Sequence, residues 1–467
     1  MQVPILSGIT ANAVADFRTS YPRNYIPVPK QTGIAQGYLR PADGLELFAT
    51  GPGVDRGGFN WNGVLHRVMG SKLCRVTSGG AVTVLGDVGG STERVTIHNG
   101  PDYLSIWSAG SLYYWDGVTL TRVTDPDLGS VIDGVWIAGY NLSTDGTYLI
   151  ATDLTDKTAV NPLKYGTAES DPDPILAVDK LLNEAYALGR YTIEAFDNVG
   201  GANFPFQRIE GAQVPRGIIG THAYAKFAST FAFIGSARDE SPAVYAMAPG
   251  DTNKLSTREI DQILQRYTEA ELSRCVVESK VDKGHNWLML HLPDTCWVYD
   301  LAASKAVQEP VWFELNSAIV GLATYRARGL VWCYDRWIAG DPTGVTLCTF
   351  TEAASTHYGD VIGWDFGTMA IYNEGRGAAV SSIELVALPG RVAFGADPVI
   401  WTSYSEDGET WSMEKSVKAG KQGERAKRIC WRRQGMMKNY RFQKFRGTSD
   451  AHVTFARLEM EIEPLNG

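Results

Sequence analysis

Residues 62–76 read NGVLHRVMGSKLCRV, and this stretch decides how the rest of the chain is interpreted. It opens with Asn62-Gly63, a pair that supplies the positive φ angles of a two-residue hairpin turn. Two short segments rich in apolar and β-branched residues follow, at 64–68 and 72–76. A turn signal beside such segments predicts an antiparallel hairpin.

The same pattern recurs along the chain. Seven Asn-Gly or Asp-Gly pairs precede the last residue, with first positions 43, 62, 99, 116, 133, 145 and 407. Five of the seven fall between 62 and 146, among segments such as Leu112-Tyr113-Tyr114-Trp115. The 467 residues are 44% apolar and 20% charged, with 49 Gly and 13 Trp, which excludes disorder, collagen and coiled coil. We expect an all-β protein.

An apolar segment that ends in Asp repeats at a regular distance. Its last residues are Asp116, Asp153, Asp197, Asp300 and Asp335, separated by 37, 44, 103 and 35 residues. If the step of 103 covers two units, every step matches the roughly 40–50 residues of a four-stranded propeller blade. The spacing therefore predicts a β-propeller of six or seven blades over residues 58–355. A chance run of β-meanders is the alternative.

Three further regions complete the predicted architecture. Residues 1–57 include the proline-rich segment 21–29 and are interpreted as an extended N-terminal arm. Ser256-Thr257-Arg258-Glu259 resembles a capping box and predicts one inserted helix at 257–272, with a possible second start at Thr268. Beyond 356 the repeat stops but strand-like segments continue, so we expect a separate C-terminal β-domain over residues 356–467.

The charge is unevenly distributed. Residues 415–446 hold twelve basic residues and one acid, Glu424, a net of +11, so the −9 of the whole chain leaves −20 on the rest. Such a segment, interleaved with Trp431, Tyr440, Phe442 and Phe445, could bind a phosphate backbone or an acidic neighbouring subunit, or form a solvated strand face. The residues chosen as a candidate subunit or partner interface are Lys421, Arg425, Lys427, Arg428, Arg432, Arg433, Lys438 and Arg441.

Signals for catalysis are weak. The seven His and six Cys lack metal-ligand spacing, and neither a G-x-S-x-G nor a Walker A sequence occurs, so we predict no catalytic residue, metal or cofactor. No apolar run is long enough for a membrane span. Residues 405–411, SEDGETW, resemble the Asp-box turn of sialidase-type propellers. A glycan-binding or sialidase-like propeller therefore stays as the alternative function.

Several segments resemble one known family. They are GYLRPADG at 37–44, LGDVGGS at 85–91, IDQILQRYTEAE at 260–271, and HLP at 291–293 followed by WVYD at 297–300. In this order they resemble the tail hub, or packaged-DNA stabilization, proteins of lambdoid short-tailed bacteriophages. The match spreads over more than half of the chain, whereas its C-terminal third matches mainly as a pattern of strands and basic segments.

This resemblance implies a structural virion protein of the viral tail, without catalysis, that is made and assembled in the host bacterial cytoplasm. Members of the family form a homo-hexamer below the portal and its adaptor ring, extend the DNA channel and retain the packaged genome until genome ejection. They also anchor a tail needle or plug and tailspikes or tail fibres. DNA that slides through the lumen needs weak contacts, so we expect an acidic lumen and a basic segment turned toward an acidic partner.

Overall fold

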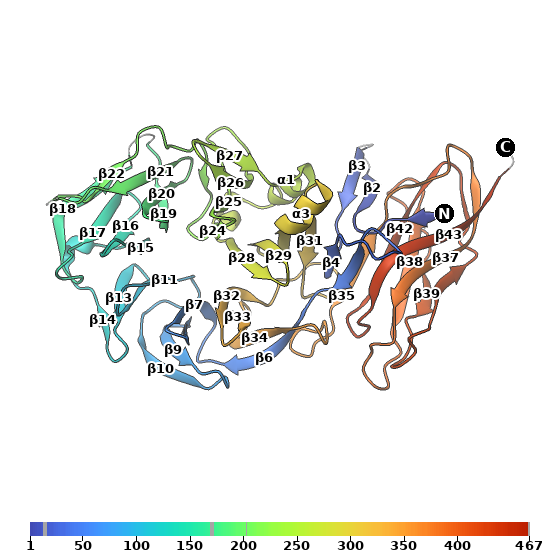
Figure 1. Cartoon of the computed structure of the whole chain (residues 1–467), viewed down its shortest axis with the longest axis horizontal. Helices are drawn as coiled ribbons and strands as arrows, with labels where there is room; N and C mark the ends of the chain where they lie inside the picture. The colour runs from blue at the N-terminus through green and yellow to red at the C-terminus, as the bar shows by residue number, and fades with distance from the viewer. Residues whose placement is uncertain (13–15, 169–171, 202, 466–467) are drawn as a thin grey trace.

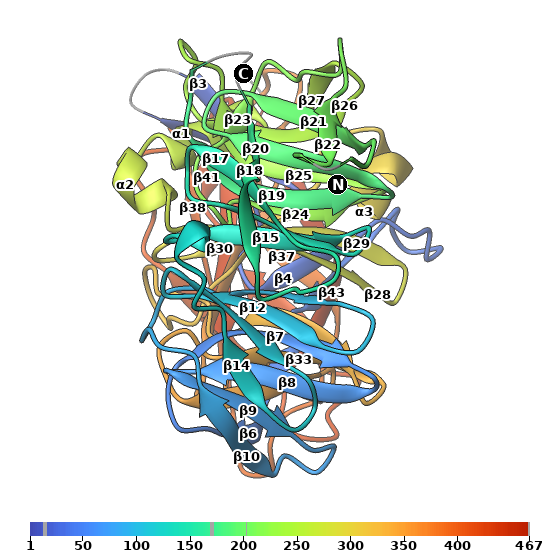
Figure 2. The same ribbon diagram turned by 90° about the vertical axis from the view of Figure 1, so that its left-hand side faces the viewer.

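The computed structural model describes residues 1–12, 16–168, 172–201 and 203–465. Seven antiparallel sheets are arranged in a ring, six with four strands and one with five, and a two-sheet β-sandwich lies beside the ring (Figure 1). Figure 2 looks at the ring from the side opposite the sandwich, where successive blades lie one above another. The fold is thus a seven-bladed propeller joined to a sandwich, and the predicted all-β class is confirmed.

Each blade is a meander of consecutive strands. Blades one to three contain β7 (Asp55–Trp61), β8 (Val64–Met69), β9 (Lys72–Val76), β10 (Val82–Asp87), β11 (Thr96–Asn99), β12 (Leu104–Ser108), β13 (Ser111–Trp115), β14 (Leu120–Arg122), β15 (Asp133–Ile137), β16 (Tyr140–Thr144), β17 (Tyr148–Thr152) and β18 (Val160–Thr167). Blades four and five contain β19 (Ile175–Leu181), β20 (Glu184–Gly189), β21 (Ile193–Asn198), β22 (Phe206–Arg208), β23 (Gly217–Ile218), β24 (Tyr224–Phe227), β25 (Thr230–Ser236), β26 (Ala243–Ala248) and β27 (Asp251–Lys254).

Blade six contains β28 (Val276–Asp282), β29 (His285–His291), β30 (Cys296–Asp300) and β31 (Trp312–Leu315). Blade seven takes three strands from the end of the propeller, β32 (Arg328–Cys333), β33 (Arg336–Gly340) and β34 (Thr346–Thr351), and its outermost strand from the N-terminal region, β6 (Gly44–Thr50). β6 pairs antiparallel with β34, with Gly44 opposite Thr351 and Thr50 opposite Thr346. A strand from the start of the chain therefore closes the ring.

The sequence signals lie where the blades need them. Asn62 and Gly63 have φ angles of 52° and 77° and form the turn between β7 and β8. Four of the repeated segments that end in Asp are the third strands of blades two, three, four and six, namely β13, β17, β21 and β30. The fifth, at Asp335, lies in the turn between β32 and β33 instead. The spacing of these Asp-ended segments in the sequence therefore reflects the third strands of successive blades, which occupy equivalent positions.

The predicted N-terminal arm over residues 1–57 requires correction. β1 (Gln2–Val3) pairs with β43 (Thr454–Pro464), and β4 (Tyr25–Val28) and β5 (Tyr38–Pro41) extend the same sandwich sheet. β2 (Gly8–Asn12) and β3 (Asp16–Ser20) form a separate hairpin. The prolines of residues 21–29 fit because β4 is an edge strand, where a missing N–H removes no ladder bond.

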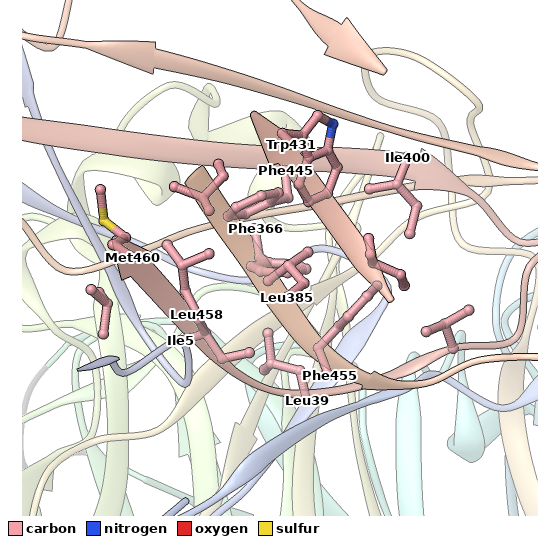
Figure 3. Packing of buried hydrophobic residues seen from close by; sticks show 14 of the residues in the cluster. Ile5, Leu39, Phe366, Leu385, Ile400, Trp431, Phe445, Phe455, Leu458 and Met460 are labelled. Atoms are coloured by element: carbon pink, nitrogen blue, oxygen red, sulfur yellow. The ribbon is translucent and has the colours of Figure 1, made fainter. Parts of the chain in front are cut away.

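The sandwich has two sheets with one core between them. One contains β4, β5, β43, β37 (Ala378–Leu388) and β40 (Ile429–Arg432), with β1 and β41 (Met436–Met437) alongside. The other contains β35 (Gly363–Gly367), β42 (Tyr440–Thr448), β38 (Val399–Ser405) and β39 (Lys415–Lys418), with β36 (Ile371–Tyr372) alongside. In Figure 3, Leu385 and Leu458 of the first sheet face Phe366 and Phe445 of the second. Burial of these apolar side chains stabilises the domain.

The single helix predicted at 257–272 is two short helices, α1 (Arg258–Leu264) and α2 (Glu269–Leu272). The capping box forms at the second start, where the Thr268 and Glu271 side chains bond reciprocally to the backbone, and the Thr257 side chain caps nothing. The structure also contains the 3-10 turn η1 (Pro126–Leu128) and a third helix, α3 (Leu301–Val307). Asp300 caps α3 by accepting from the N–H groups of Ala302 and Ala303.

Arg23 and Asn24 join the two domains. The Asn24 amide donates to the carbonyls of Asn316, at 2.9 Å, and Gly363, at 2.7 Å, one on each side of the junction. Arg23 donates through Nε to Asp365 of β35 at 2.7 Å, and its backbone bridges Glu314 of β31. Because Asn24 is buried and fully bonded, this junction fixes the sandwich against blade six.

Candidate interaction surface on the sandwich

Residues 415–432 follow one side of the sandwich from one sheet to the other, and residues 440–446 continue into β42, an interior strand. β39 is the edge strand of one sheet and β40 that of the other, and residues 419–428 connect them. The indole N–H of Trp431 donates to the carbonyl of Lys415 at 3.1 Å and ties the two edges together. The basic segment is therefore a continuous side of the domain rather than a free tail.

The structure exposes most of the candidate interface residues. Seven of the eight have exposed side chains, namely Lys421, Arg425, Lys427, Arg428, Arg432, Arg433 and Lys438. Residues 421–428 are all exposed, so four of these cations lie in one loop. Exposed cations that are concentrated in one loop attract a negatively charged partner and orient it.

Arg441 was wrongly included in the interface. Its side chain is completely buried in β42, where it donates to the Gln434 carbonyl at 2.6 Å and to Gln443 Oε1. The guanidinium lies 3.9 Å from the centre of the Tyr404 ring, and burial lowers the pKa of Arg441 to about 10. In β42, Arg441 shares a face with Phe445 of the core, two pairs of residues further along the strand. This residue stabilises the domain and cannot meet a partner.

The interleaved aromatic residues are buried or half-buried. Trp431 and Phe445 belong to the sandwich core, and Phe442 is 1% exposed. Tyr440 is half-buried. Stacking of nucleic acid bases requires exposed aromatic faces. The aromatic residues within 415–446 therefore offer no freely exposed ring for stacking.

Only some of the exposed cations have acidic partners. Arg428 donates to both carboxylate oxygens of Glu384, at 2.8 Å through Nε, and lowers the pKa of Glu384. Lys418 bonds to Asp397 and lowers the pKa of that carboxyl. In the part of the chain that the structure describes, six cations form no ion pair: Lys421, Arg425, Lys427, Arg432, Arg433 and Lys438.

This surface is set within an acidic molecule. Residues 1–355 carry 28 basic and 38 acidic side chains, a formal charge of −10. Residues 356–467 carry 15 and 14, and because the basic segment contributes +11, the rest of this region also carries −10. The segment is therefore the one strongly positive stretch in a chain whose remaining surface favours repulsion between copies.

The propeller places its charged residues differently. Arg67 of β8 is fully buried and donates to Asp55 of β7 through Nε at 2.8 Å and to the Gly329 carbonyl of β32 at 2.7 Å. Arg94 pairs with Glu278 of β28 at 2.9 Å. These pairs link blades one, six and seven, and they act inside the ring rather than at its surface.

The remaining sequence motifs form no metal site in the part of the chain that the structure describes. Within the described ranges, no three His, Cys, Asp or Glu side chains are grouped as a metal site requires, and no helix is long and apolar enough to cross a membrane. All six cysteines are free thiols. The Asp-box-like turn at residues 405–411 lies in the sandwich rather than in the propeller, and Trp411 is 40% exposed rather than packed.

Comparison with known proteins covers both domains. Residues 1–355 match the family described as "Bacteriophage P22 Gp10, beta-propeller", and residues 363–463 match "Bacteriophage P22 Gp10, beta-sandwich". The tail hub protein gp10 of Salmonella phage P22 is 28% identical over 485 residues, which covers 99% of each chain.

Solved structures are similar only at a coarse level. A computationally designed protein, Ika8, is 10% identical, with a TM-score of 0.40 over 66% of this chain and 99% of that one. The N-terminal domain of Nup159 is also 10% identical, with a TM-score of 0.40 over 69% of this chain and 97% of that one.

Proposed function

This chain belongs to the bacteriophage P22 Gp10 family, and we propose that it forms the hub of a short phage tail. It is a structural component of the virion tail and associates with other tail components. The observation that carries this conclusion is similarity to a tail hub protein across both domains and 99% of the chain. The proposed role is mechanical rather than catalytic.

We further propose a closed ring of six copies below the portal and its adaptor ring. In this arrangement the ring extends the DNA channel, retains the packaged genome until ejection, and anchors a needle or plug and tailspikes or tail fibres. A head-to-tail contact between two different surfaces of one chain is the kind that closes a ring. The net negative charge of the propeller supports weak contact with passing DNA, because like charge repels a phosphate backbone.

The seven exposed residues of the basic segment are the proposed contact with an acidic surface of a partner ring. Their support is geometric: six of them are exposed and form no ion pair within the described chain, and four lie in the single loop 421–428. Cations already satisfied by neighbours would gain little from a partner, whereas these can form new charge-assisted bonds. Arg441 is excluded because it is buried.

Native mass spectrometry of the full chain mixed with a portal–adaptor complex tests the ring. The expected result is a single complex that holds six copies of the chain. A complex with two copies related by two-fold symmetry contradicts the proposed ring, because an isologous interface does not generate six-fold closure.

Charge reversal tests the proposed surface. The triple variant K421E/R425E/K427E should bind the portal–adaptor complex at least tenfold more weakly than the original chain, with a reduced dependence of binding on salt. The matched control is R75E/R122E/R266E, which makes the same change in net charge at three exposed propeller residues. Equal loss in both variants, or no loss in the first, contradicts the assignment.

A further inference from the structure

The Asp-box-like turn that begins at Ser405 is held by its own hydrogen bonds. Asp407 accepts from the backbone N–H groups of Glu409, at 2.9 Å, and Thr410, at 2.8 Å, and Gly408 has a φ of 81°. The hydroxyl of Ser405 accepts from the N–H of Gly408 at 2.7 Å. These bonds stiffen the turn, and the residue that follows it is the exposed Trp411.

Trp411 lines a pocket of about 230 Å³ on the outer face of the sandwich. Strands β38 and β42 form the floor, where Trp401 is opposite Arg446 and Ser403 is opposite Lys444. The segment after the turn forms the wall. The pocket is lined by Trp401, Ser403, Trp411, Ser412, Glu414, Lys444 and Arg446.

The charged residues of the pocket hold it in shape. Arg446 lies 4.6 Å from the centre of the Trp401 ring and donates to both oxygens of Glu414, at 2.6 Å through Nε. This hydrogen bond lowers the pKa of Glu414 and raises that of Arg446, so both remain charged at neutral pH. Because the Arg446–Glu414 pair holds the Trp401 indole in place, the indole loses little conformational freedom when a ligand binds.

Several donors in the pocket have no protein partner. Among the residues that the structure describes, nothing accepts from the indole N–H of Trp401 or Trp411, and the hydroxyl of Ser403 forms no hydrogen bond although the residue is 8% exposed. The nearest carboxylate to the Lys444 ammonium is Asp365, at 3.9 Å. Two aromatic rings and three donors without a partner in the described chain therefore meet in one small space, beside the Lys444 ammonium.

We propose that this pocket binds a pyranose sugar. A pyranose presents apolar C–H groups on its ring faces and hydroxyl groups around its edge, so it can pack on an indole while its hydroxyls accept from the unused donors. An anchor residue of a protein partner would favour a mainly apolar pocket, but five of the seven lining residues are polar. The site lies in the sandwich, away from the propeller, and requires neither ring assembly nor catalysis.

Saturation-transfer difference NMR on the full chain tests the proposal. The probes are the methyl glycosides of D-glucose, D-galactose, D-mannose and L-rhamnose, together with N-acetylglucosamine, and Trp fluorescence gives the affinity. We expect saturable binding of at least one probe. Trp411→Ala should weaken that binding at least tenfold, and Lys444→Gln should weaken it about threefold.

The matched control is Trp332→Ala, because Trp332 is 49% exposed in the propeller and lies outside the pocket. Its affinity for the sugar should stay within twofold of the original. Absence of binding by all five probes, or equal binding by Trp411→Ala, overturns the proposal. If no sugar binds but Trp411→Ala weakens the portal–adaptor complex, the pocket is a protein contact, and the sugar assignment is wrong while the hub function stands.

Discussion

Arg67 in the propeller and Arg425 in the sandwich are the same residue type in opposite settings. Arg67 is 0% exposed, bonded to Asp55 and to the Gly329 carbonyl, and connects blade one with blade seven. Arg425 is exposed in the loop 421–428, and no ion pair of the described chain includes it. The buried Arg67 guanidinium has lost its hydration and depends on its protein partners. The Arg425 guanidinium stays hydrated, and its charge can still pair with an acidic group of another molecule.

The buried arginine serves the stability of the propeller, whereas the exposed arginine is free to contact a partner. The propeller closes over seven blades through β6 from the N-terminal region, and the buried pair of Arg67 and Asp55 lies where blade one meets blade seven. The exposed cations of the loop 421–428 form few contacts within their own domain, and the pair of Arg428 with Glu384 is the exception that the described chain shows. Substitutions in the propeller interior should therefore lower the free energy of unfolding, whereas substitutions in the loop 421–428 should weaken partner binding and leave stability unchanged.

Arg67→Ala should lower the free energy of unfolding by about 3–5 kcal/mol, because it leaves Asp55 charged and buried without its partner. Chemical denaturation followed by circular dichroism measures the loss. Arg75→Ala, on the exposed face of the adjacent strand, is the control and should change stability by less than about 0.5 kcal/mol. Equal effects of the two variants would contradict the contrast drawn here.

The buried carboxyl of Asp133 should make the stability of the propeller depend on pH. Burial raises the pKa of Asp133 to about 7, although bonds from Thr96 and the Val178 N–H oppose the shift. The folded state therefore binds more protons than the unfolded state between about pH 4 and 7, and stability falls as pH rises through that window. Relative to Asp133→Asn, the original chain should lose about 3 kcal/mol between pH 5 and 8.

The measurement is the difference between two denaturation series, one for each protein, at pH 5, 6, 7 and 8. Taking the difference removes the contributions of other buried groups, such as His98, whose pKa burial lowers to about 4. A difference that is constant across this range would show that Asp133 ionises normally in the folded chain.

Arg441→Ala should destabilise the sandwich by about 2–3 kcal/mol, since the Gln434 carbonyl and the Gln443 amide lose their buried donor. Arg441→Met restores part of the volume but none of the hydrogen bonds, so it should recover only part of the loss. Thermal melting measures both variants. If Arg441→Ala leaves the melting temperature unchanged and weakens partner binding instead, its placement in the core is wrong.

Arg425→Ala should have the smallest effect on folding, less than about 0.5 kcal/mol, because the side chain is exposed and unpaired. Its free energy of unfolding comes from the same denaturation assay as for Arg67. A loss above about 1 kcal/mol would mean that the exposed loop 421–428 supports its own domain, and the comparison between Arg67 and Arg425 would fail.

The sequence predicted the propeller because blade period and turn chemistry are local properties. Asn62-Gly63 marked its hairpin correctly, but the turns at Ala109-Gly110 and Ala138-Gly139 also place both residues at positive φ without Asn or Asp. Tertiary packing forces these turns. Closure of the ring by β6 could not be predicted, because it joins residues about 300 positions apart and leaves no local pattern.

The basic segment was also visible in the sequence, since charge composition needs no structure. Exposure was not: Arg441 and Arg446 are equally basic, yet one faces the core and the other faces outward. The two-residue period of β42 places Arg441 on the same face as Phe445, a signal that would have identified it once the strand was recognised. The pocket lined by Trp401 and Trp411 brings the loop 406–414 against β38 and β42, and the sequence alone does not show this approach.

Cryo-electron microscopy of the intact virion tests the central claim most directly. We expect a six-fold ring of this chain in the tail below the portal, in which each subunit consists of a seven-bladed propeller and a sandwich. If the chain is absent from the tail, or is present there as a two-fold dimer, the proposed hub is wrong.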